Sequence, residues 1–162
     1  MNKNNLQQLL VEGLKDLYDA EKQITKALPK MASEAKTADL RQAFEDHLGQ
    51  TKAQVRRLEK VFEELNVADW QKECKGMQAI IQEGEEMVKE TSDPIARDAT
   101  LISAAQHVEH YEMAGYGTVV SYAHKLDHKS VAEQLQQTLN EEKQADLLLS
   151  QIAETKLNGR TR

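Results

Sequence analysis

The feature that most constrains the fold of this chain is its scarcity of helix-breaking residues. Its 162 residues include two prolines and seven glycines. Alanine, leucine, glutamate, glutamine and lysine, which all favour helices, dominate the rest. Apolar residues recur every three to four positions along most of the chain, as they do on one face of an amphipathic helix. The sequence therefore predicts an all-α fold.

The first two predicted long helices form a hairpin. One runs from about residue 5 to 34, and the next from about 37 to 65 with Thr37 as a candidate N-cap. Pro29 is expected to kink the first helix, because proline lacks the N–H that the helical ladder needs. A crossover over residues 66–92 then holds a shorter amphipathic helix. Because the turn between the two long helices is short, we expect them to be antiparallel neighbours.

A second hairpin follows the crossover. Its first helix covers about residues 93–125 and opens with an Asp-Pro pair, which is a strong start signal. Its second helix begins either near Asp127 or at a capping box formed by Ser130 and Glu133. It ends near Asn158, where a glycine follows. Two antiparallel hairpins joined by a long crossover make a ferritin-like four-helix bundle with a fifth, shorter helix in the crossover, and we expect it to form one domain over the whole chain, 1–162.

Each of the four long helices places a metal-capable side chain on its predicted apolar face. The helical spacing of these stripes predicts that six such residues point inward. They are Glu21 in the first helix, His47 in the second, Glu109 and Glu112 in the third, and Glu142 and Asp146 in the fourth. Unpaired buried carboxylates are costly, so four helices are not expected to bury them without a compensating charge. The pattern therefore predicts a shared polar cluster.

The predicted inward residues also lie at matching depths in the bundle. Glu21 and His47 are nearly equally far along the chain from the turn of the first hairpin. Glu112 and Glu142 are equally far from the turn of the second. In di-metal carboxylate bundles, carboxylate oxygens and histidine nitrogens from several helices clamp two cations in this way. The sequence thus predicts a two-metal site in the interior.

Each of these residues also has a simpler interpretation. A single inward glutamate is often a half-exposed residue at the rim of a bundle, and His47 could be a core histidine satisfied by hydrogen bonds. Asp146 could form a salt bridge with a neighbour. Gln50 is a weak ligand that we expect beside the site, and Tyr18 and Tyr116 are expected to be core aromatics whose hydroxyls reach toward it. Because the acids lie at matched depth on separate helices, a shared cluster is favoured over an individual explanation for each residue.

Charge and cysteine content limit the partners and the cellular location expected for the protein. The net charge is -6 at pH 7, and acidic and basic residues are interspersed, which argues against nucleic acid as a partner. The apolar runs are only a few residues long, too short for a membrane-spanning helix. The single Cys74 cannot form an intrachain disulfide, and no signal-peptide pattern opens the sequence. A cytoplasmic location is therefore expected.

Four segments carry a resemblance to a known family. They are DLYDAEKQI at 16–24, AFEDHLGQT at 43–51, QHVEHYEMAGYGT at 106–118 and LNEEKQADLLL at 139–149. The chain resembles the bacterial YciF-like stress proteins of the ferritin-like superfamily over nearly its whole length. The resemblance implies a homodimer, an association with general stress, and a dinuclear iron or manganese site without an established reaction. The positions that match the family motifs are Glu21, His47, Glu109, Glu112, Glu142 and Asp146.

One position departs from the family pattern. The resembling sequences commonly carry an acid one turn after the histidine, in the pattern HLxET, where this chain has Gln50. The second helix then offers one anionic ligand fewer. This predicts a weaker hold on one of the two cations, and it leaves the occupancy of the site open.

Two glycines inside the third long helix need an explanation of their own. Gly115 and Gly117 each cost about 1 kcal/mol relative to alanine in a helix. They are expected to serve a close helix contact or a dimer face. Together with the resemblance, they predict self-association through long helix surfaces.

Three functions are compatible with these features. The first is a redox-active di-metal protein acting on hydrogen peroxide or dioxygen, with Glu109 and Glu142 bridging the ions and Glu21, Glu112 and His47 as terminal ligands. The chain has no CxxC motif, so such a protein needs an external reductant. The second is a dimeric structural or interaction bundle with no catalytic activity. Iron storage is the third, and nothing in the sequence identifies the cage interfaces that it would require.

Overall fold

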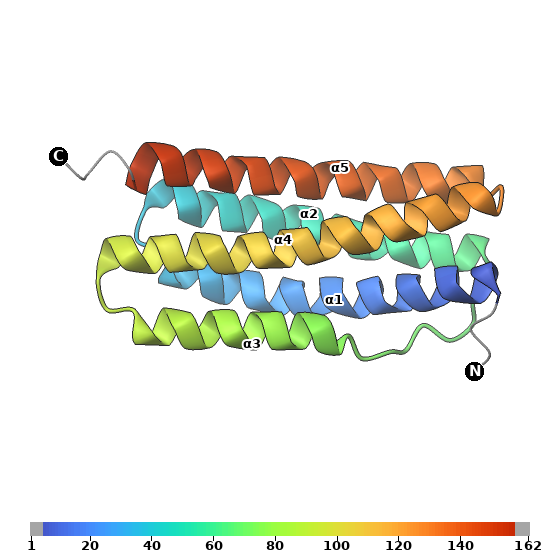
Figure 1. Cartoon of the computed structure of the whole chain (residues 1–162), viewed down its shortest axis with the longest axis horizontal. Helices are drawn as coiled ribbons and strands as arrows, with labels where there is room; N and C mark the ends of the chain where they lie inside the picture. Colours follow the sequence, from blue (N-terminus) through green and yellow to red (C-terminus); the bar gives the residue numbers. More distant parts are fainter. Residues whose placement is uncertain (1–4, 158–162) are drawn as a thin grey trace.

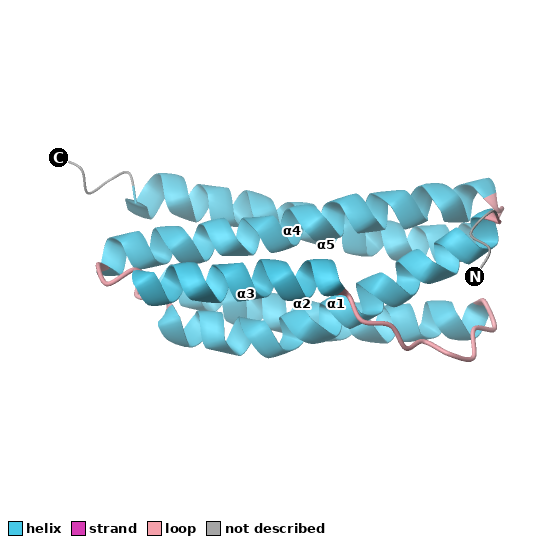
Figure 2. Cartoon of the chain, turned by 60° about the horizontal axis from the view of Figure 1, so that its bottom comes forward, coloured by secondary structure: helices cyan, strands magenta, loops and turns pink. Residues whose placement is uncertain are grey.

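The computed structural model describes residues 5–157, and these residues form a bundle of α-helices (Figure 1). The elements are α1 (Leu6–Glu34), α2 (Ala38–Glu64), α3 (Lys75–Glu90), α4 (Pro94–Lys125), α5 (Lys129–Ile152) and a π-helical turn (Ala153–Leu157). No strand occurs between residues 5 and 157 (Figure 2). The predicted all-α fold, with four long helices and a shorter one in the crossover, is confirmed. Within the same residues, no helix is long and apolar enough to cross a membrane.

The four long helices lie side by side as two antiparallel hairpins. α1 packs against α2, and α4 packs against α5. The hairpins meet through α1 with α4 and through α2 with α5. The shorter α3 lies outside this square and contacts α1 and α4, so the crossover covers one side of the bundle (Figure 1).

The starts of α2 and α4 depend on two aspartates. Asp93 caps α4, because its Oδ1 accepts a hydrogen bond from the Ala96 N–H at 2.8 Å, and the predicted start is confirmed. Thr37 is the N-cap residue of α2, but its side chain makes no capping hydrogen bond. Instead, Asp98 of α4 accepts hydrogen bonds from the N–H groups of Lys36 and Thr37 at 2.7 and 2.9 Å. A carboxylate at this helix N-terminus is favourable because it satisfies free N–H groups and complements the helix dipole.

Other predicted boundaries need correction. α5 begins at Lys129, and its N-cap residue is His128, which lies between the two predicted starts at Asp127 and Ser130. The capping box does not form, because the Ser130 hydroxyl donates to Glu64 Oε2 at 3.1 Å. The predicted end at Asn158 lies outside the described residues. α1 continues through Pro29 to Glu34, and the kink expected there stays a prediction.

Two groups of buried apolar side chains fill the bundle, one toward each end. The first includes Ile24, Leu28, Phe44, Leu101, Val108 and Leu149. The second includes Leu14, Leu17, Leu58, Phe62, Val120 and Leu135. On each long helix, a predicted metal-capable residue lies near the change from one group to the other. The candidate site is therefore a polar layer between two apolar ends.

Cys74 ties the crossover to α1. Its backbone N–H donates to Asp19 Oδ2 at 2.8 Å, and its carbonyl accepts from Gln23 Nε2 at 3.1 Å. The buried thiol lies 3.3 Å from Asp16 Oδ2 and 3.2 Å from the Tyr111 hydroxyl. Burial raises the pKa of this thiol. These contacts fix the loop just before α3 begins.

Candidate metal centre

The polar layer at mid-bundle contains five of the six predicted metal ligands. They are Glu21 of α1, His47 of α2, Glu109 and Glu112 of α4, and Glu142 of α5, and none is more than 7% exposed. Helical periodicity explains why they meet. Each continues the apolar stripe of its own helix, so packing the stripes together also brings these side chains inward.

Four of these residues form a compact group. His47, Glu109, Glu112 and Glu142 offer ligand atoms that all lie within 4.8 Å of one another. His47 Nε2 is 3.2 Å from Glu109 Oε1 and 3.6 Å from Glu142 Oε2. Metal–ligand bonds of about 2.0–2.2 Å place opposite ligands about 4.4 Å apart. Small side-chain movements would therefore let the four residues surround one cation.

Glu21 lies on the other side of this group, beside Glu112. The Tyr116 hydroxyl donates a hydrogen bond to Glu21 Oε1 at 2.5 Å, and both side chains are fully buried. Tyr116 thus holds one carboxylate oxygen of Glu21 and leaves the other free. The Tyr116 hydroxyl therefore lies beside the cluster, at the carboxylate of Glu21.

Most of the ligand-type atoms in the cluster have no hydrogen-bond partner. These atoms are Glu21 Oε2, His47 Nε2, Glu109 Oε2, Glu142 Oε2 and both carboxylate oxygens of Glu112. Buried acceptors without partners are destabilising, and they would be satisfied by a bound cation. A set of carboxylate oxygens with one imidazole nitrogen suits iron or manganese. The residues present therefore fit the predicted metal.

The pKa values of the cluster follow from burial and from like charges. Burial raises the pKa of Glu21 to about 7, although the Tyr116 hydrogen bond and the charge of His47 both lower it. Burial and neighbouring carboxylates raise the pKa values of Glu112 and Glu142 well above the ordinary range. Burial lowers the pKa of His47, but the nearby Glu109 carboxylate outweighs this effect and the net shift is upward. Protons and cations would thus compete for these groups.

Two predicted site residues lie outside the cluster. Asp146 Oδ1 accepts a hydrogen bond from Gln106 Nε2 at 3.1 Å and lies 3.2 Å from His110 Nε2. Its contacts therefore match the salt-bridge interpretation. The Tyr18 hydroxyl donates to Glu59 Oε1 at 3.0 Å and does not reach the cluster.

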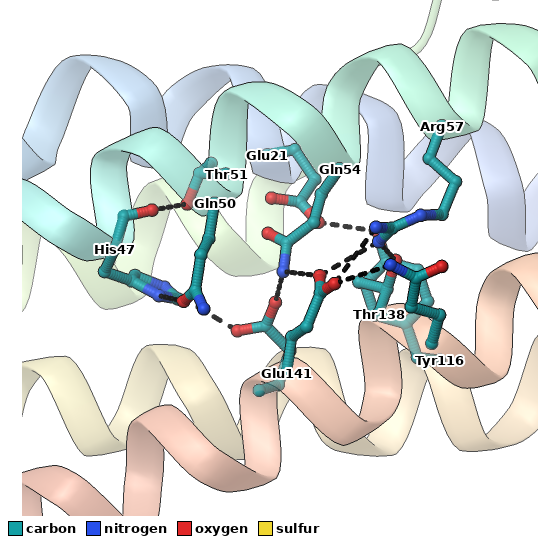
Figure 3. A network of polar contacts seen from close by, with 11 residues as sticks. Glu21, His47, Gln50, Thr51, Gln54, Arg57, Tyr116, Thr138 and Glu141 are labelled. Carbon is teal, nitrogen blue, oxygen red and sulfur yellow. Dashed lines mark hydrogen bonds and ion pairs between the residues drawn. The ribbon is translucent and has the colours of Figure 1, made fainter.

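Gln50 contacts the histidine and not the acids. It is exposed, and its Oε1 lies 3.3 Å from His47 Nδ1, the ring nitrogen opposite the one that faces Glu109 (Figure 3). The amide therefore accepts a hydrogen bond from His47 when Nδ1 carries the proton. In that tautomer, Nε2 presents its lone pair to the cluster.

The sequence pattern did not single out Gln54, which is fully buried beside the acids. Its Nε2 donates hydrogen bonds to Glu142 Oε1 and, at 3.0 Å, to Glu141 Oε2 (Figure 3). Its position was detectable, because Gln54 follows His47 by two helical turns and so shares its face. An amide is a poor metal ligand, and a search for metal-capable residues passes over it.

An ion pair closes the polar layer between α2 and α5. Arg57 donates two hydrogen bonds to Glu141, from Nη1 at 2.9 Å and from Nη2 at 3.0 Å, and a third to the Thr138 hydroxyl at 2.5 Å (Figure 3). Although burial acts in the opposite direction, Arg57 lowers the pKa of Glu141. Arg57 is thus committed to Glu141 rather than to the buried acids of the cluster.

The chain matches known proteins over nearly its full length. Residues 5–162 match the family described as a domain of unknown function, DUF892. Protein YciF of Escherichia coli strain K12 is 40% identical over 159 residues, which cover 98% of this chain and 96% of that protein.

Solved structures agree with this similarity. The crystal structure of the E. coli stress protein YciF has a TM-score of 0.92 and 37% identity, covering 97% of this chain and 99% of that one. YcfI from Rhodopseudomonas palustris, for which a structural role has been suggested, has a TM-score of 0.89 and 39% identity, covering 93% and 97%. A protein from Xanthomonas campestris, at 20% identity and a TM-score of 0.75 over 96% and 95%, shares the fold.

Proposed function

This chain belongs to the DUF892 family and is YciF-like, and from that premise we propose that its buried cluster binds two metal ions, either iron or manganese. The observation that carries the proposal is the set of partnerless acceptor atoms contributed by four helices. One ion would take ligands from His47, Glu109, Glu112 and Glu142. The second would take Glu21 and share the Glu112 carboxylate.

Internal hydrogen bonds do not account for the cluster. Glu21 receives a donor from Tyr116, and Glu142 receives one from Gln54. Glu112 is fully buried, and among residues 5–157 the only partner within reach of its carboxyl is Glu21, so a proton shared between these two acids would neutralise just one of them. A cation at this point would neutralise several carboxylates together, which a single proton cannot do.

The chain's own residues would orient the ligands around the ions. Tyr116 holds one oxygen of Glu21, Gln54 holds one oxygen of Glu142, and Gln50 sets the tautomer of His47. Such partners fix ligand geometry and tune metal affinity. The second apolar group shields its side of the layer from bulk water.

We propose a reaction with peroxide or dioxygen under stress conditions. A bound pair of iron or manganese ions supplies the electrons and Lewis acidity that such a reaction needs. The E. coli relative is described as a stress protein, and we extend that role to this chain. The reductant would come from another molecule, because the one cysteine is buried and bonded within the crossover.

Metal content is the direct test. Protein purified without chelator from cells supplied with iron or manganese should contain about two ions per chain by elemental analysis. Glu112→Ala should lose most of that metal, whereas Asp146→Ala should retain it, because Asp146 lies outside the cluster. Metal-loaded protein should then consume peroxide when a small-molecule reductant is added. A wild-type protein that binds neither ion would refute the proposal.

The alternative is a structural bundle whose acids stay protonated. The raised pKa values of Glu112 and Glu142 favour it, and a structural role has been suggested for the R. palustris relative. A structural bundle predicts that chelation leaves the melting temperature unchanged. The metal proposal predicts a fall on chelation, because a ligand that binds only the folded state stabilises it.

We also propose that the protein self-associates through the surface of α4. A Cβ at Gly115 would lie 2.8 Å from Leu17 Cδ2, so this glycine serves a contact within the chain. A Cβ at Gly117 would meet no atom within 4 Å, which leaves that face available to a second copy. Sedimentation at micromolar concentration should give the mass of a dimer. A strictly monomeric mass would contradict the proposal.

A further inference from the structure

We infer that the bundle contains a binding site for a small apolar molecule that ends in one neutral O–H group. The site is a cavity of about 550 Å³ bordered by all five α-helices. Small-molecule sites typically have about 300–1,000 Å³ and mostly apolar walls. The cavity lies in the first apolar group, on one side of the polar layer.

The walls of this cavity are largely aliphatic and aromatic. They include Ile24, Leu28, Phe44, Leu101, Val108 and Leu149. Leu148 also lines the cavity although it is 44% exposed, so it marks the mouth. An apolar molecule would bury hydrophobic surface against these side chains, and this is the main source of its affinity.

The inner end of the cavity reaches the candidate metal centre. His47 and Glu109 line it, and both are more than nine-tenths buried. Glu109 Oε2 has no hydrogen-bond partner. A hydroxyl-type donor on a ligand would satisfy this oxygen, and it would anchor the polar end of the molecule beside the metal ligands.

The charges around the cavity favour a neutral ligand. At the rim, Lys30 Nζ lies 3.2 Å from Glu85 Oε1, and Arg97 pairs with Glu34. Lys89 and Asp46 are the other charged residues of the rim, so positive and negative charges balance there. At the inner end, His47 Nε2 already faces Glu109 and Glu142, so no free positive charge remains there to bind a carboxylate. A long-chain alcohol or a related O–H compound fits both ends.

Alkyl hydroperoxides have this form, with an apolar chain and a terminal neutral O–H group. The choice of an alkyl hydroperoxide over hydrogen peroxide as substrate class rests on the proposed function. The binding step itself needs no metal, so it can be tested separately from that function.

The first test measures binding to metal-free protein. Calorimetric titration near neutral pH should show one molecule of 1-octanol per chain. Octanoate should bind at least about tenfold more weakly, because its charge would be buried with no free positive group to pair with it. Absence of octanol binding would overturn the inference, and equal binding of octanoate would overturn the assigned head group.

Two exposed leucines on α5 provide a matched pair of variants. Leu148 lines the mouth, whereas its neighbour Leu147, at 50% exposure, does not. Leu148→Asp should weaken octanol binding about tenfold, and Leu147→Asp should change it less than about twofold. Both positions are exposed, so both variants should fold. Equal losses would overturn the placement of the site.

A second pair fills the cavity from α2. Ala43 and Ala53 are both partly buried, but only Ala43 lines the cavity. Ala43→Phe should weaken octanol binding at least about tenfold, whereas Ala53→Phe should not. Metal content is measured on the same purified proteins before the metal is removed for titration. Octanol binding without metal would refute the proposed function alone, and metal without octanol binding would refute this inference alone.

Discussion

The two sides of the metal centre balance their charges differently. On the histidine side, His47 faces Glu109 and Glu142, and the raised pKa of the imidazole favours its positive form beside those acids. On the tyrosine side, Glu21 and Glu112 have only the neutral Tyr116 hydroxyl as a donor. The histidine side therefore carries its own countercharge, and the tyrosine side depends on protons or on a cation.

This difference changes the meaning of Gln50. From the sequence, a missing acid at this position predicted a weaker hold on one of the cations. In the structure, Gln50 is exposed and contacts His47 Nδ1. Its effect on a metal would therefore pass through the imidazole on the histidine side, and it would leave Glu21 and Glu112 untouched.

The largest expected effect comes from removing the acid that pairs with the histidine. With metal at about a thousandfold excess over its dissociation constant, bound ligand adds about 4 kcal/mol to the free energy of unfolding. Glu109→Ala should lose this increment, which for a chain of this size is about 8–16 °C in melting temperature. Thermal melts with and without manganese or iron measure it, and Asp146→Ala is the control. Equal metal-induced rises in wild type and Glu109→Ala would place the ions elsewhere.

The tyrosine side should dominate the pH dependence of the metal-free protein. The pKa of Glu21 is raised from 4.5 to about 7, so the folded state holds a proton that the unfolded state has already lost. This contribution to stability is complete below pH 4.5 and is lost as the pH rises to about 7, which amounts to about 3 kcal/mol. Glu21→Gln should remove it. Urea unfolding across this pH range is the measurement, and identical pH profiles for the two proteins would show that Glu21 does not titrate as described.

A smaller effect should follow from removing the donor on the tyrosine side. Tyr116→Phe deletes the hydrogen bond to Glu21 and should lower the free energy of unfolding by about 2 kcal/mol. Because that hydrogen bond lowers the pKa of Glu21, its loss should move the pH dependence to higher pH. Tyr18→Phe is the matched control, since the Tyr18 hydroxyl bonds Glu59 outside the cluster. If both variants shift the pH profile equally, Tyr116 has no special role.

The smallest effect concerns the histidine side. In Gln50→Glu, a carboxylate beside His47 Nδ1 should make the imidazole a stronger ligand and tighten metal binding severalfold, or about 1 kcal/mol. Gln78→Glu makes the same charge change at an exposed position on α3. Metal titrations of the two variants and wild type should therefore separate local from general charge effects. If both variants bind metal equally more tightly than wild type, the effect of Gln50→Glu comes from the added net charge and not from its contact with His47.

Much of the fold was predictable because it depends on local signals. Apolar spacing located the helices, and Asp93 with Pro94 marked the start of α4. The start of α5 was harder to locate. Asp127 adopts a left-handed conformation at φ 58°, and the Ser130 hydroxyl is engaged by Glu64 of α2. A contact between residues far apart in sequence therefore replaced the expected local capping box.

The site was predictable where face and depth decide the outcome. Four glutamates and one histidine lie together in the interior, because the apolar stripe of each helix fixes both the face and the depth of its side chain. Asp146 follows Glu142 by one turn, yet Gln106 and His110 of α4 engage it outside the cluster. Which neighbour engages a side chain at the edge of a stripe depends on tertiary packing. The hydrogen bonds of Gln54 could not be read from its residue type, for the same reason.

The attachment of Cys74 to α1 has a consequence for how the protein opens. The thiol is fully buried and its pKa is raised, so a maleimide or similar reagent cannot react with it in the closed state. Reaction requires the segment before α3 to leave Asp16 and Asp19. The rate of alkylation would therefore report how often the crossover opens locally. Its dependence on denaturant would show whether the crossover opens alone or with the whole bundle.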